Sequence, residues 1–305
     1  MRNSSTTLPR VSILILTYNQ RELTAECLAS LAASDYPNAE MVVLDNASSD
    51  GTEELVRREY PRVRYIQNGK NLGYAEGNNV GLRYAMQSHA DYALALNNDT
   101  VVAPDMVSQL VRAAEANPNA AFVGPLVYHF DEPDVIQSAG GLRTTDWRFY
   151  HRGQNATDCG QFKQIERVVW VSGCAIMARC AALEKIGLID PAFFAYNEEV
   201  DWCVRAGELG YEILFVPAAH VWHKGVQRRY NPSPRVTYFS ARNELLLLKK
   251  HHAGWRAMTS TWLRHVRTLI SWSVRPRWRE KRAHRDALAR GLRDFVRGNF
   301  GAPTW

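Results

Sequence analysis

Residues 94–100 read Leu-Ala-Leu-Asn-Asn-Asp-Thr, so an apolar run ends abruptly in two asparagines and an aspartate. A short buried strand with a carboxylate at its C-terminal end lies where open α/β sheets bind ligands. The carboxylate of Asp99 and the amide of Asn97 offer oxygen ligands that suit a hard divalent cation such as Mg²⁺ or Mn²⁺. A strand followed by an Asx-type turn is the alternative interpretation of this segment taken alone.

The residues before and after this segment repeat one pattern, in which an apolar run is followed by a turn and then by helical spacing. Strands are predicted at residues 11–16, 41–44, 63–67 and 92–96, and helices at residues 21–33, 53–60, 75–88 and 105–117. This alternation with short links predicts a doubly wound, mostly parallel α/β sheet with right-handed crossovers. The C-terminal ends of parallel strands share one edge, so we expect the polar residues that follow them to converge there.

The residues expected at this edge suit a nucleotide. Thr17 and Asn19 are short polar groups, and Asp45 can accept hydrogen bonds from a base or a ribose. Gly73 permits close backbone approach, and the helix start near Ala75 favours a phosphate. Each of these polar residues alone is also a common turn former or cap. Neither GxGxxG nor GxxxxGK[ST] occurs here, so neither a dinucleotide fingerprint nor a P-loop is predicted.

A second acidic segment lies at residues 193–205, which read Phe-Phe-Ala-Tyr-Asn-Glu-Glu-Val-Asp-Trp-Cys-Val-Arg. Three carboxylates fall within four residues at a predicted helix start, where capping of the helix dipole is the alternative role. A positioned carboxylate in such a segment can act as a general base that takes the proton of an attacking hydroxyl. One carboxylate for this base, and one for a metal that neutralises the charge of a leaving phosphate group, are sufficient for group transfer to a hydroxyl.

In this order, the segments resemble the motifs of inverting nucleotide-sugar glycosyltransferases of the GT-A fold, above all the large family that includes bacterial rhamnosyltransferases. The matching segments are residues 11–19, 43–52, 71–73 with Asn78 and Asn79, and 94–100. The resemblance covers about residues 10–250. It implies nucleotide binding by the first two segments and donor binding by Asn71, Gly73, Asn78 and Asn98. The last segment is the family's metal site, where Asn97 replaces one aspartate of the stricter pattern.

The resemblance also implies roles for residues later in the chain. Glu199 stands at the position of the catalytic base, with Asp201 as the second choice, and Glu198 is expected to contact the donor. The segment 170–173, which begins with Trp170, is expected beside the donor or acceptor sugar. His223 matches a histidine that completes the metal shell or contacts the diphosphate.

Composition limits the compartment and the class of protein. The five cysteines form no CxxC pair and no zinc spacing, which favours a reduced, cytoplasmic location. No stretch of about 20 apolar residues occurs, so no membrane-spanning helix is expected.

Charge is distributed unevenly along the chain. Residues 1–223 contain 18 Lys and Arg against 27 Asp and Glu, whereas residues 224–305 contain 19 against 4. In the basic part, tryptophans alternate with arginines, which suits an interfacial helix on anionic lipid at the inner face of a membrane. A packed helix with a solvated basic face is the alternative. Lys224, Arg228 and Arg229 are expected to neutralise phosphates, or else to form a solvated basic loop.

Three parts are therefore predicted. A polar tail (1–10) precedes a GT-A domain (11–250), which has a nucleotide-binding half (11–128) and an acceptor half (129–250), and a basic helical extension (251–305) follows. The expected reaction is inverting sugar transfer from a dTDP- or UDP-linked sugar, with dTDP-rhamnose as the leading donor, aided by Mg²⁺ or Mn²⁺. The expected acceptor is a glycan or lipid-linked sugar of cell-surface polysaccharide synthesis.

Two other functions fit parts of the sequence. A nucleotidyltransferase that makes nucleotide-sugars would carry a glycine-rich, basic first loop, and residues 17–20, Thr-Tyr-Asn-Gln, are not such a loop. A basic protein that binds nucleic acid through residues 224–305 would show steeply salt-dependent binding. The order of the motifs favours the glycosyltransferase, so no nucleic-acid partner is expected.

Overall fold

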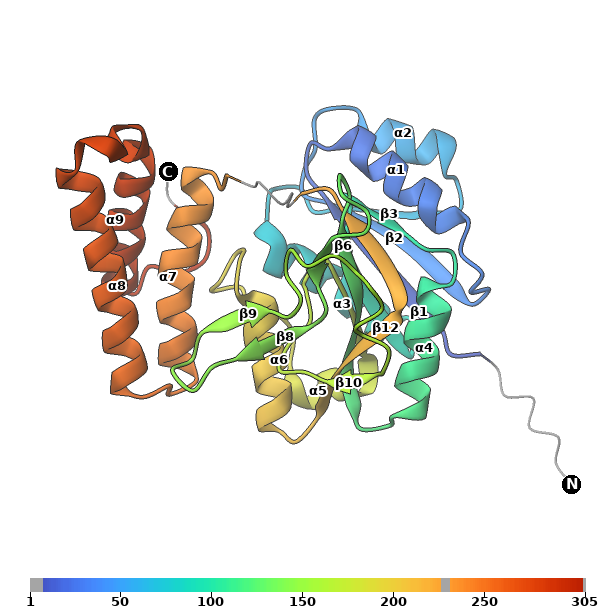
Figure 1. Cartoon of the computed structure of the whole chain (residues 1–305). Helices are drawn as coiled ribbons and strands as arrows, with labels where there is room; N and C mark the ends of the chain where they lie inside the picture. Colours follow the sequence, from blue (N-terminus) through green and yellow to red (C-terminus); the bar gives the residue numbers. More distant parts are fainter. Residues whose placement is uncertain (1–7, 226–230, 304–305) are drawn as a thin grey trace, which may run out of the picture.

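A mostly parallel β-sheet lies at the centre of the molecule, with helices on its faces and a layer of three longer helices to one side (Figure 1). The computed structural model describes residues 8–225 and 231–303. The strands follow the order β10-β12-β6-β11-β4-β1-β2-β3 across the sheet. This is the doubly wound α/β architecture predicted from the alternating segments.

The first half of the chain supplies the all-parallel part of the sheet. Its strands are β1 (Val11–Thr17), β2 (Ala39–Asp45), β3 (Arg64–Gln67) and β4 (Tyr92–Asn97). β1 pairs in parallel with β2 and β4, and β2 pairs in parallel with β3. The register places Thr17 opposite Asp45 and Leu16 opposite Asn97, so these strands end together at one edge.

Helices cover both faces of this part of the sheet, because successive strand residues point to opposite faces. The helices are α1 (Arg21–Ala32), α2 (Thr52–Glu59), α3 (Gly73–Gln87) and α4 (Met106–Ala116). Ile13 and Ile15 of β1 belong to the buried cluster that includes residues of α1, α2 and α4, whereas Leu14 belongs to the cluster with α3. Burial on both faces explains why β1 is apolar throughout.

The second half of the chain extends the sheet and adds the remaining elements. The strands are β5 (Thr100–Val102), β6 (Ala120–His129), β7 (Ile136–Ser138), β8 (Gly141–Arg143), β9 (Phe149–His151), β10 (Glu166–Arg167), β11 (Ala175–Arg179) and β12 (Glu212–His223), and the helices are α5 (Cys180–Ile186) and α6 (Glu198–Glu208). β11 runs antiparallel between β4 and β6. β12 is a long strand, because it continues through an irregularity between Val216 and His220 as far as His223.

The C-terminal part of the chain forms a helical layer beside the sheet (Figure 1). It comprises α7 (Pro234–Lys250), α8 (Trp255–Val274), the short 3₁₀ helix η1 (Pro276–Lys281) and α9 (Arg282–Arg297). Ala241 and Leu245 of α7 share a buried cluster with Leu288 and Leu292 of α9. The layer therefore starts at Pro234, earlier than the boundary at residue 251 that we expected for the extension. Among the described residues, none of the helices has the length and hydrophobicity needed to cross a bilayer.

Helix α7 connects this layer to the rest of the molecule. The buried guanidinium of Arg242 donates to the backbone carbonyl of Phe193 at 2.9 Å, and Asn243 donates to the carbonyls of Ala195 and Tyr196 at 2.7 and 2.8 Å. Satisfied polar groups of this kind make a buried contact specific. They hold the segment that leads into α6, and α6 starts with the two glutamates of the acidic segment.

Candidate functional site

Two adjoining cavities lie at the edge where the parallel strands end. Their volumes are about 500 and 370 Å³, and both are lined by Tyr74, Asn97, Asp99, Ala195 and Tyr196. The larger cavity is also bordered by the strand ends and by the start of α7, and the smaller one by the start of α6 and the end of β12. Segments separated by more than a hundred residues therefore converge on one continuous hollow, and Asp99 and Glu199 line the same cavity.

The sheet itself brings His223 to Asp99. Strand β5 begins directly after Asp99, and its pairing with β12 places Thr100 opposite His223. As a result, His223 Nε2 lies 3.2 Å from Asp99 Oδ1 and 3.5 Å from Asn97 Nδ2. The other ring nitrogen, Nδ1, lies 3.1 Å from Gln137 Oε1. A hydrogen bond of this kind fixes the orientation of a histidine that binds a metal.

The side chains of Asp99, His223 and Asn97 together suit a divalent cation. Asp99 Oδ1 is buried and, apart from the ring contact of His223, has no hydrogen-bond donor among residues 8–225 and 231–303. A carboxylate, an imidazole and an amide are ligands that Mn²⁺ or Mg²⁺ accepts. The described part of the chain has no group of three His, Cys, Asp or Glu residues that could hold a metal. A cation here would thus take its remaining ligands from phosphate oxygens or water.

Of the predicted nucleotide-binding residues, Thr17, Asn71, Gly73 and Asn98 line the larger cavity. Asn98 Nδ2 donates to Thr17 Oγ1 at 3.3 Å, which joins the ends of β1 and β4. Gly73 has a φ of +75°, and a Cβ there would lie 2.6 Å from the ring of Phe194, so only glycine fits.

One expectation about this region is wrong. The N–H groups of Tyr74 and Ala75 both donate to the carbonyl of Phe194, at 2.7 and 3.1 Å. The start of α3 therefore does not offer these amides to a phosphate.

Four other predicted donor residues line neither cavity: Asn19, Asp45, Asn78 and Trp170. Asp45 is buried and accepts hydrogen bonds from the backbone and side chain of Ser48 at 2.9 and 2.6 Å. Asn19 orders the same loop, Asn78 donates to a carbonyl within α3, and Trp170 packs under His151 with ring centroids 4.5 Å apart. Direct contact of these four residues with a donor stays a prediction.

Glu198 and Glu199 form the start of α6 and line the smaller cavity. Each has a buried Oε2 atom with no hydrogen-bond partner in the described residues. Burial, and then the charge of Glu199, raise the pKa of Glu198 well above its ordinary value. Burial also raises the pKa of Glu199, but the backbone N–H groups at the start of α6 oppose this shift. We therefore assign the first ionisation of the pair to Glu199, whose charged form these N–H groups favour, and the retained proton to Glu198.

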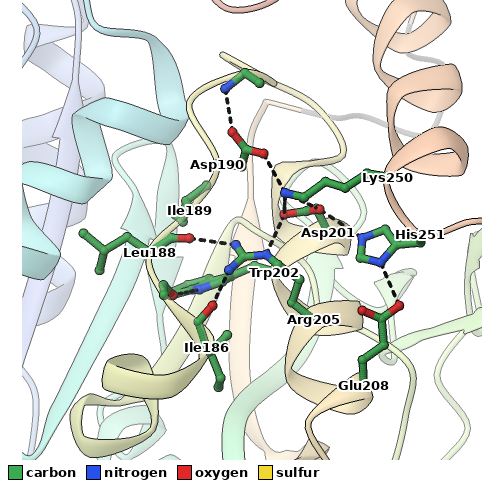
Figure 2. Close-up of polar contacts among 12 residues, drawn as sticks. Ile186, Leu188, Ile189, Asp190, Asp201, Trp202, Arg205, Glu208, Lys250 and His251 are labelled. Atoms are coloured by element: carbon green, nitrogen blue, oxygen red, sulfur yellow. Dashed lines mark hydrogen bonds and ion pairs between the residues drawn. The ribbon is translucent and has the colours of Figure 1, made fainter.

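Asp201, two residues after Glu199 on α6, does not line this cavity and lies instead in a network of charged groups (Figure 2). Its carboxylate is fully buried and lies 3.0 Å from His251 Nε2, 2.9 Å from Arg205 Nε and 3.0 Å from Lys250 Nζ. Burial alone would raise the pKa of Asp201, but the hydrogen bond with His251 and the charges of Arg205 and Lys250 hold it below its ordinary value. The structure does not bring this candidate base into either cavity.

The structure adds cavity residues that the sequence did not single out. Ser233, Arg235, Val236 and Phe239 bring the start of α7 into the larger cavity, and Gln137, His151 and Gln154 line the smaller one beside Ser172 and Gly173 of the segment expected at the sugar. Arg235 is a cation with no ion pair among the described residues. No motif marks these positions, because they depend on how the helical layer and the segment 129–173 pack.

Lys224 pairs with Glu26 instead of lining a cavity. The predicted phosphate ligands Arg228 and Arg229 lie outside the described residues.

Comparison with known proteins gives one consistent result. A family model described as glycosyl transferase family 2 matches residues 12–187. N-acetylglucosaminyl-diphospho-decaprenol L-rhamnosyltransferase of Mycobacterium tuberculosis is 28% identical over 266 residues, which are 80% of this chain and 86% of that protein. The dTDP-rhamnosyl transferase RfbF of Shigella flexneri is 24% identical over 252 residues, covering 78% and 80%. The solved mannosyltransferase PcManGT of Pyrobaculum calidifontis, in complex with GDP-Man and Mn²⁺, shares the fold with a TM-score of 0.60 at 17% identity, covering 95% and 88%.

Proposed function

Because the chain belongs to glycosyl transferase family 2 and is a glycosyltransferase of the GT-A fold, we propose that it transfers a sugar with inversion from a nucleoside-diphospho-sugar to a hydroxyl group. One observation carries the proposal: Asp99, His223 and Glu199 line a single cavity at the C-terminal edge of the sheet. Groups that can hold a diphosphate and a group that can accept a proton are thus within reach of one sugar.

Glu199 is the base in this proposal. The acceptor oxygen attacks the anomeric carbon, its proton passes to Glu199, and the bond from that carbon to the diphosphate oxygen breaks. The buried, unpartnered Oε2 of Glu199 can receive this proton. Glu198, which keeps its own proton to higher pH, would donate a hydrogen bond to the donor sugar or the acceptor. Asp201 holds α6 in place from outside the cavity.

The leaving diphosphate needs its charge neutralised. Asp99, His223 and Asn97 would hold a Mg²⁺ or Mn²⁺ ion, which supplies that neutralisation when bound. The solved mannosyltransferase was crystallised with Mn²⁺ and a nucleotide-sugar, which supports a divalent cation here. Arg235, which lines the larger cavity without an ion pair among the described residues, would bind a phosphate oxygen directly.

We propose dTDP-rhamnose as the donor and a lipid-linked or glycan hydroxyl as the acceptor, in cell-surface polysaccharide synthesis. The names of the two rhamnosyltransferases support this choice, and one of those names includes a diphospho-decaprenol acceptor. Residues 11–128 would bind the nucleotide and residues 129–250 the acceptor. The enzyme would act in the cytoplasm at the inner face of the cell membrane, with residues 251–305 nearest the lipid.

Substitution of the proposed base tests the function. We expect E199Q to lower the rate of rhamnosyl transfer from dTDP-rhamnose by about a hundredfold or more, because the base is lost while the shape is kept. Binding of dTDP, measured by calorimetry, should be unchanged. E184Q, at an exposed position of α5, is the matched control. Near-normal turnover of E199Q would refute the assigned base, and release of pyrophosphate from dTTP and a sugar phosphate would indicate a nucleotidyltransferase instead.

A further inference from the structure

A separate groove lies in the helical layer, away from the two cavities. Its volume is about 690 Å³. It is lined mainly by α8, by the start of η1 and by the turn of the β8–β9 hairpin. Its charged and aromatic lining residues are Arg148, Arg264, Arg267, Trp272, Arg275 and Trp278. Four arginines and no acidic residue line the groove, so it is an electropositive hollow that suits a phosphate.

Two of these arginines have charges that the protein does not neutralise. Arg148 pairs with Asp146, and Arg264 pairs with Glu244. In contrast, the guanidinium groups of Arg267 and Arg275 have neither an ion pair nor a hydrogen bond within residues 8–225 and 231–303. Both side chains are exposed, so their charges are open to an anion from solution. They present the planar donor pairs that bind phosphate oxygens.

A buried donor points to the same conclusion. Trp278 Nε1 is buried and has no hydrogen-bond partner among the described residues. An indole N–H can only donate, and a buried donor without an acceptor is costly. The N–H group of Trp278 therefore lacks an acceptor in the groove, and an oxygen atom of a bound ligand would supply one.

Apolar side chains beside the groove indicate the source of the phosphate. Leu263, Ile270 and Val274 are 54%, 55% and 69% exposed, and with Arg267 they are spaced four, three and four residues apart. This spacing places all four on one face of α8. Exposed aliphatic residues alternating with arginines are typical of a helix that lies in a membrane interface. A nucleic acid offers phosphates but no hydrocarbon into which these residues could insert.

From these observations we propose that α8 and its groove form a docking face for an anionic phospholipid bilayer, with Arg267, Arg275 and Trp278 binding a lipid phosphate. Leu263, Ile270 and Val274 would enter the acyl boundary, while the arginines extend to the headgroups. The proposal adds a binding site to the membrane location proposed above. It depends on residues outside the cavities, so it can be tested without measuring sugar transfer.

The test is co-sedimentation of the full chain with two kinds of vesicle, one of phosphatidylcholine alone and one of phosphatidylcholine mixed with phosphatidylglycerol. We expect binding to the anionic vesicles only, and a loss of about tenfold or more in R267Q/R275Q. R293Q/R297Q removes the same charge from exposed positions of α9 outside the groove and should lose less than threefold. W278F, which replaces the indole and its N–H with a smaller phenyl ring, should also weaken binding. Both arginine pairs are unpartnered in the described structure, so thermal unfolding should be unchanged.

Three outcomes would overturn the proposal. Equal losses in the two double variants would show diffuse attraction without a groove site. Arginine-dependent binding of inorganic phosphate or glycerol phosphate without vesicle binding would make the groove a site for a soluble phosphate. Binding of a single-stranded oligonucleotide with the same dependence on Arg267 and Arg275, without vesicle binding, would assign the face to nucleic acid.

Discussion

Asp201 Oδ1 lies 3.0 Å from His251 Nε2, and this contact joins the helix that starts with Glu198 and Glu199 to the end of α7 (Figure 2). Lys250 extends the connection, since its Nζ also contacts the carboxylate of Asp190. Helix α6, which carries Glu199, is therefore fixed to the helical layer. The side chains that fix it, Asp201, Lys250 and His251, lie outside the cavity and help to position Glu199.

The charge of Asp201 should be essential for stability. D201N leaves Lys250, Arg205 and the His251 ring facing a neutral amide in a buried place, and loss of one partner of a buried ion pair costs about 3 kcal/mol. Urea unfolding of the purified protein measures this loss. D286N, which removes a mostly exposed partner of Arg285, should change the free energy of unfolding by no more than about 0.5 kcal/mol. A loss below about 1 kcal/mol in D201N would mean that the network contributes little.

The histidine of this network should make stability depend on pH. Burial alone would lower the pKa of His251, but its hydrogen bonds with Asp201 and Glu208 raise it above the ordinary 6.5. A raised folded-state pKa contributes stability that is complete below pH 6.5 and is lost as the pH rises through that folded-state value. The difference in unfolding free energy between the wild type and H251Q should therefore shrink from pH 6 towards alkaline pH. A difference that stays constant with pH would show that His251 is neutral in the folded protein.

The pH profile of turnover should distinguish the two cavity glutamates. Glu199 must be ionised to act as the base, and its pKa lies above the ordinary 4.5, so kcat/KM should fall on the acid side at a higher pH than for an exposed carboxyl. Glu198 is already protonated when Glu199 titrates, so E198Q should keep this acid limb in place. The assignment would be reversed, with Glu198 as the base, by either of two results. One is an acid limb that moves in E198Q, and the other is turnover that is lost in E198Q but kept in E199Q.

Much of the fold was predictable because it follows from local pattern. The apolar strands β1, β2 and β4 and the helices between them lie within a few residues of the predicted positions, since strands buried on both faces are apolar throughout. Convergence of the strand ends follows from parallel pairing alone. The extended β12 could not be foreseen, because Pro217 and the residues after it resemble a loop and only pairing with β5 and β6 keeps them in the sheet.

The site was predictable only where a motif marks it. Asp99, Glu199 and His223 were found because their segments resemble known motifs, and the structure places all three at one cavity. Asp201 belongs to the same motif but contacts Lys250 and His251, since residues two apart on a helix, such as Glu199 and Asp201, point in different directions. Arg235 and the other residues that α7 brings to the larger cavity have no signal in the sequence, because their position depends on long-range packing.

Gly173 should be needed to position the base. A Cβ at this residue would lie 3.3 Å from both Cβ and Cγ of Glu199 and 3.4 Å from the hydroxyl of Tyr74, so G173A must displace the glutamate by a few tenths of an ångström. Misplacement of a catalytic group can cost as much as a hundredfold, so we expect kcat to fall about tenfold or more while dTDP binding persists. G207A, on the helix α6 that carries Glu199, is the control, because the nearest atom to the new Cβ there is 3.9 Å away. Normal kcat in G173A would show that Glu199 tolerates the shift.

Asp99 and His223 should determine the metal dependence of donor binding. D99N keeps the shape of the side chain but removes the charge, so we expect Mn²⁺ to strengthen dTDP binding much less in this variant than in the wild type. Calorimetric titration of dTDP with and without Mn²⁺ measures the difference independently of turnover. H223Q should also reduce the effect of Mn²⁺ on dTDP binding, but by less than D99N, because the imidazole ligand is replaced by a weaker amide ligand. D105N, at the start of α4 and outside both cavities, is the matched control. If Mn²⁺ strengthens dTDP binding equally in D99N and the wild type, the cation does not bind at the end of β4, and Arg235 becomes the leading partner of the diphosphate.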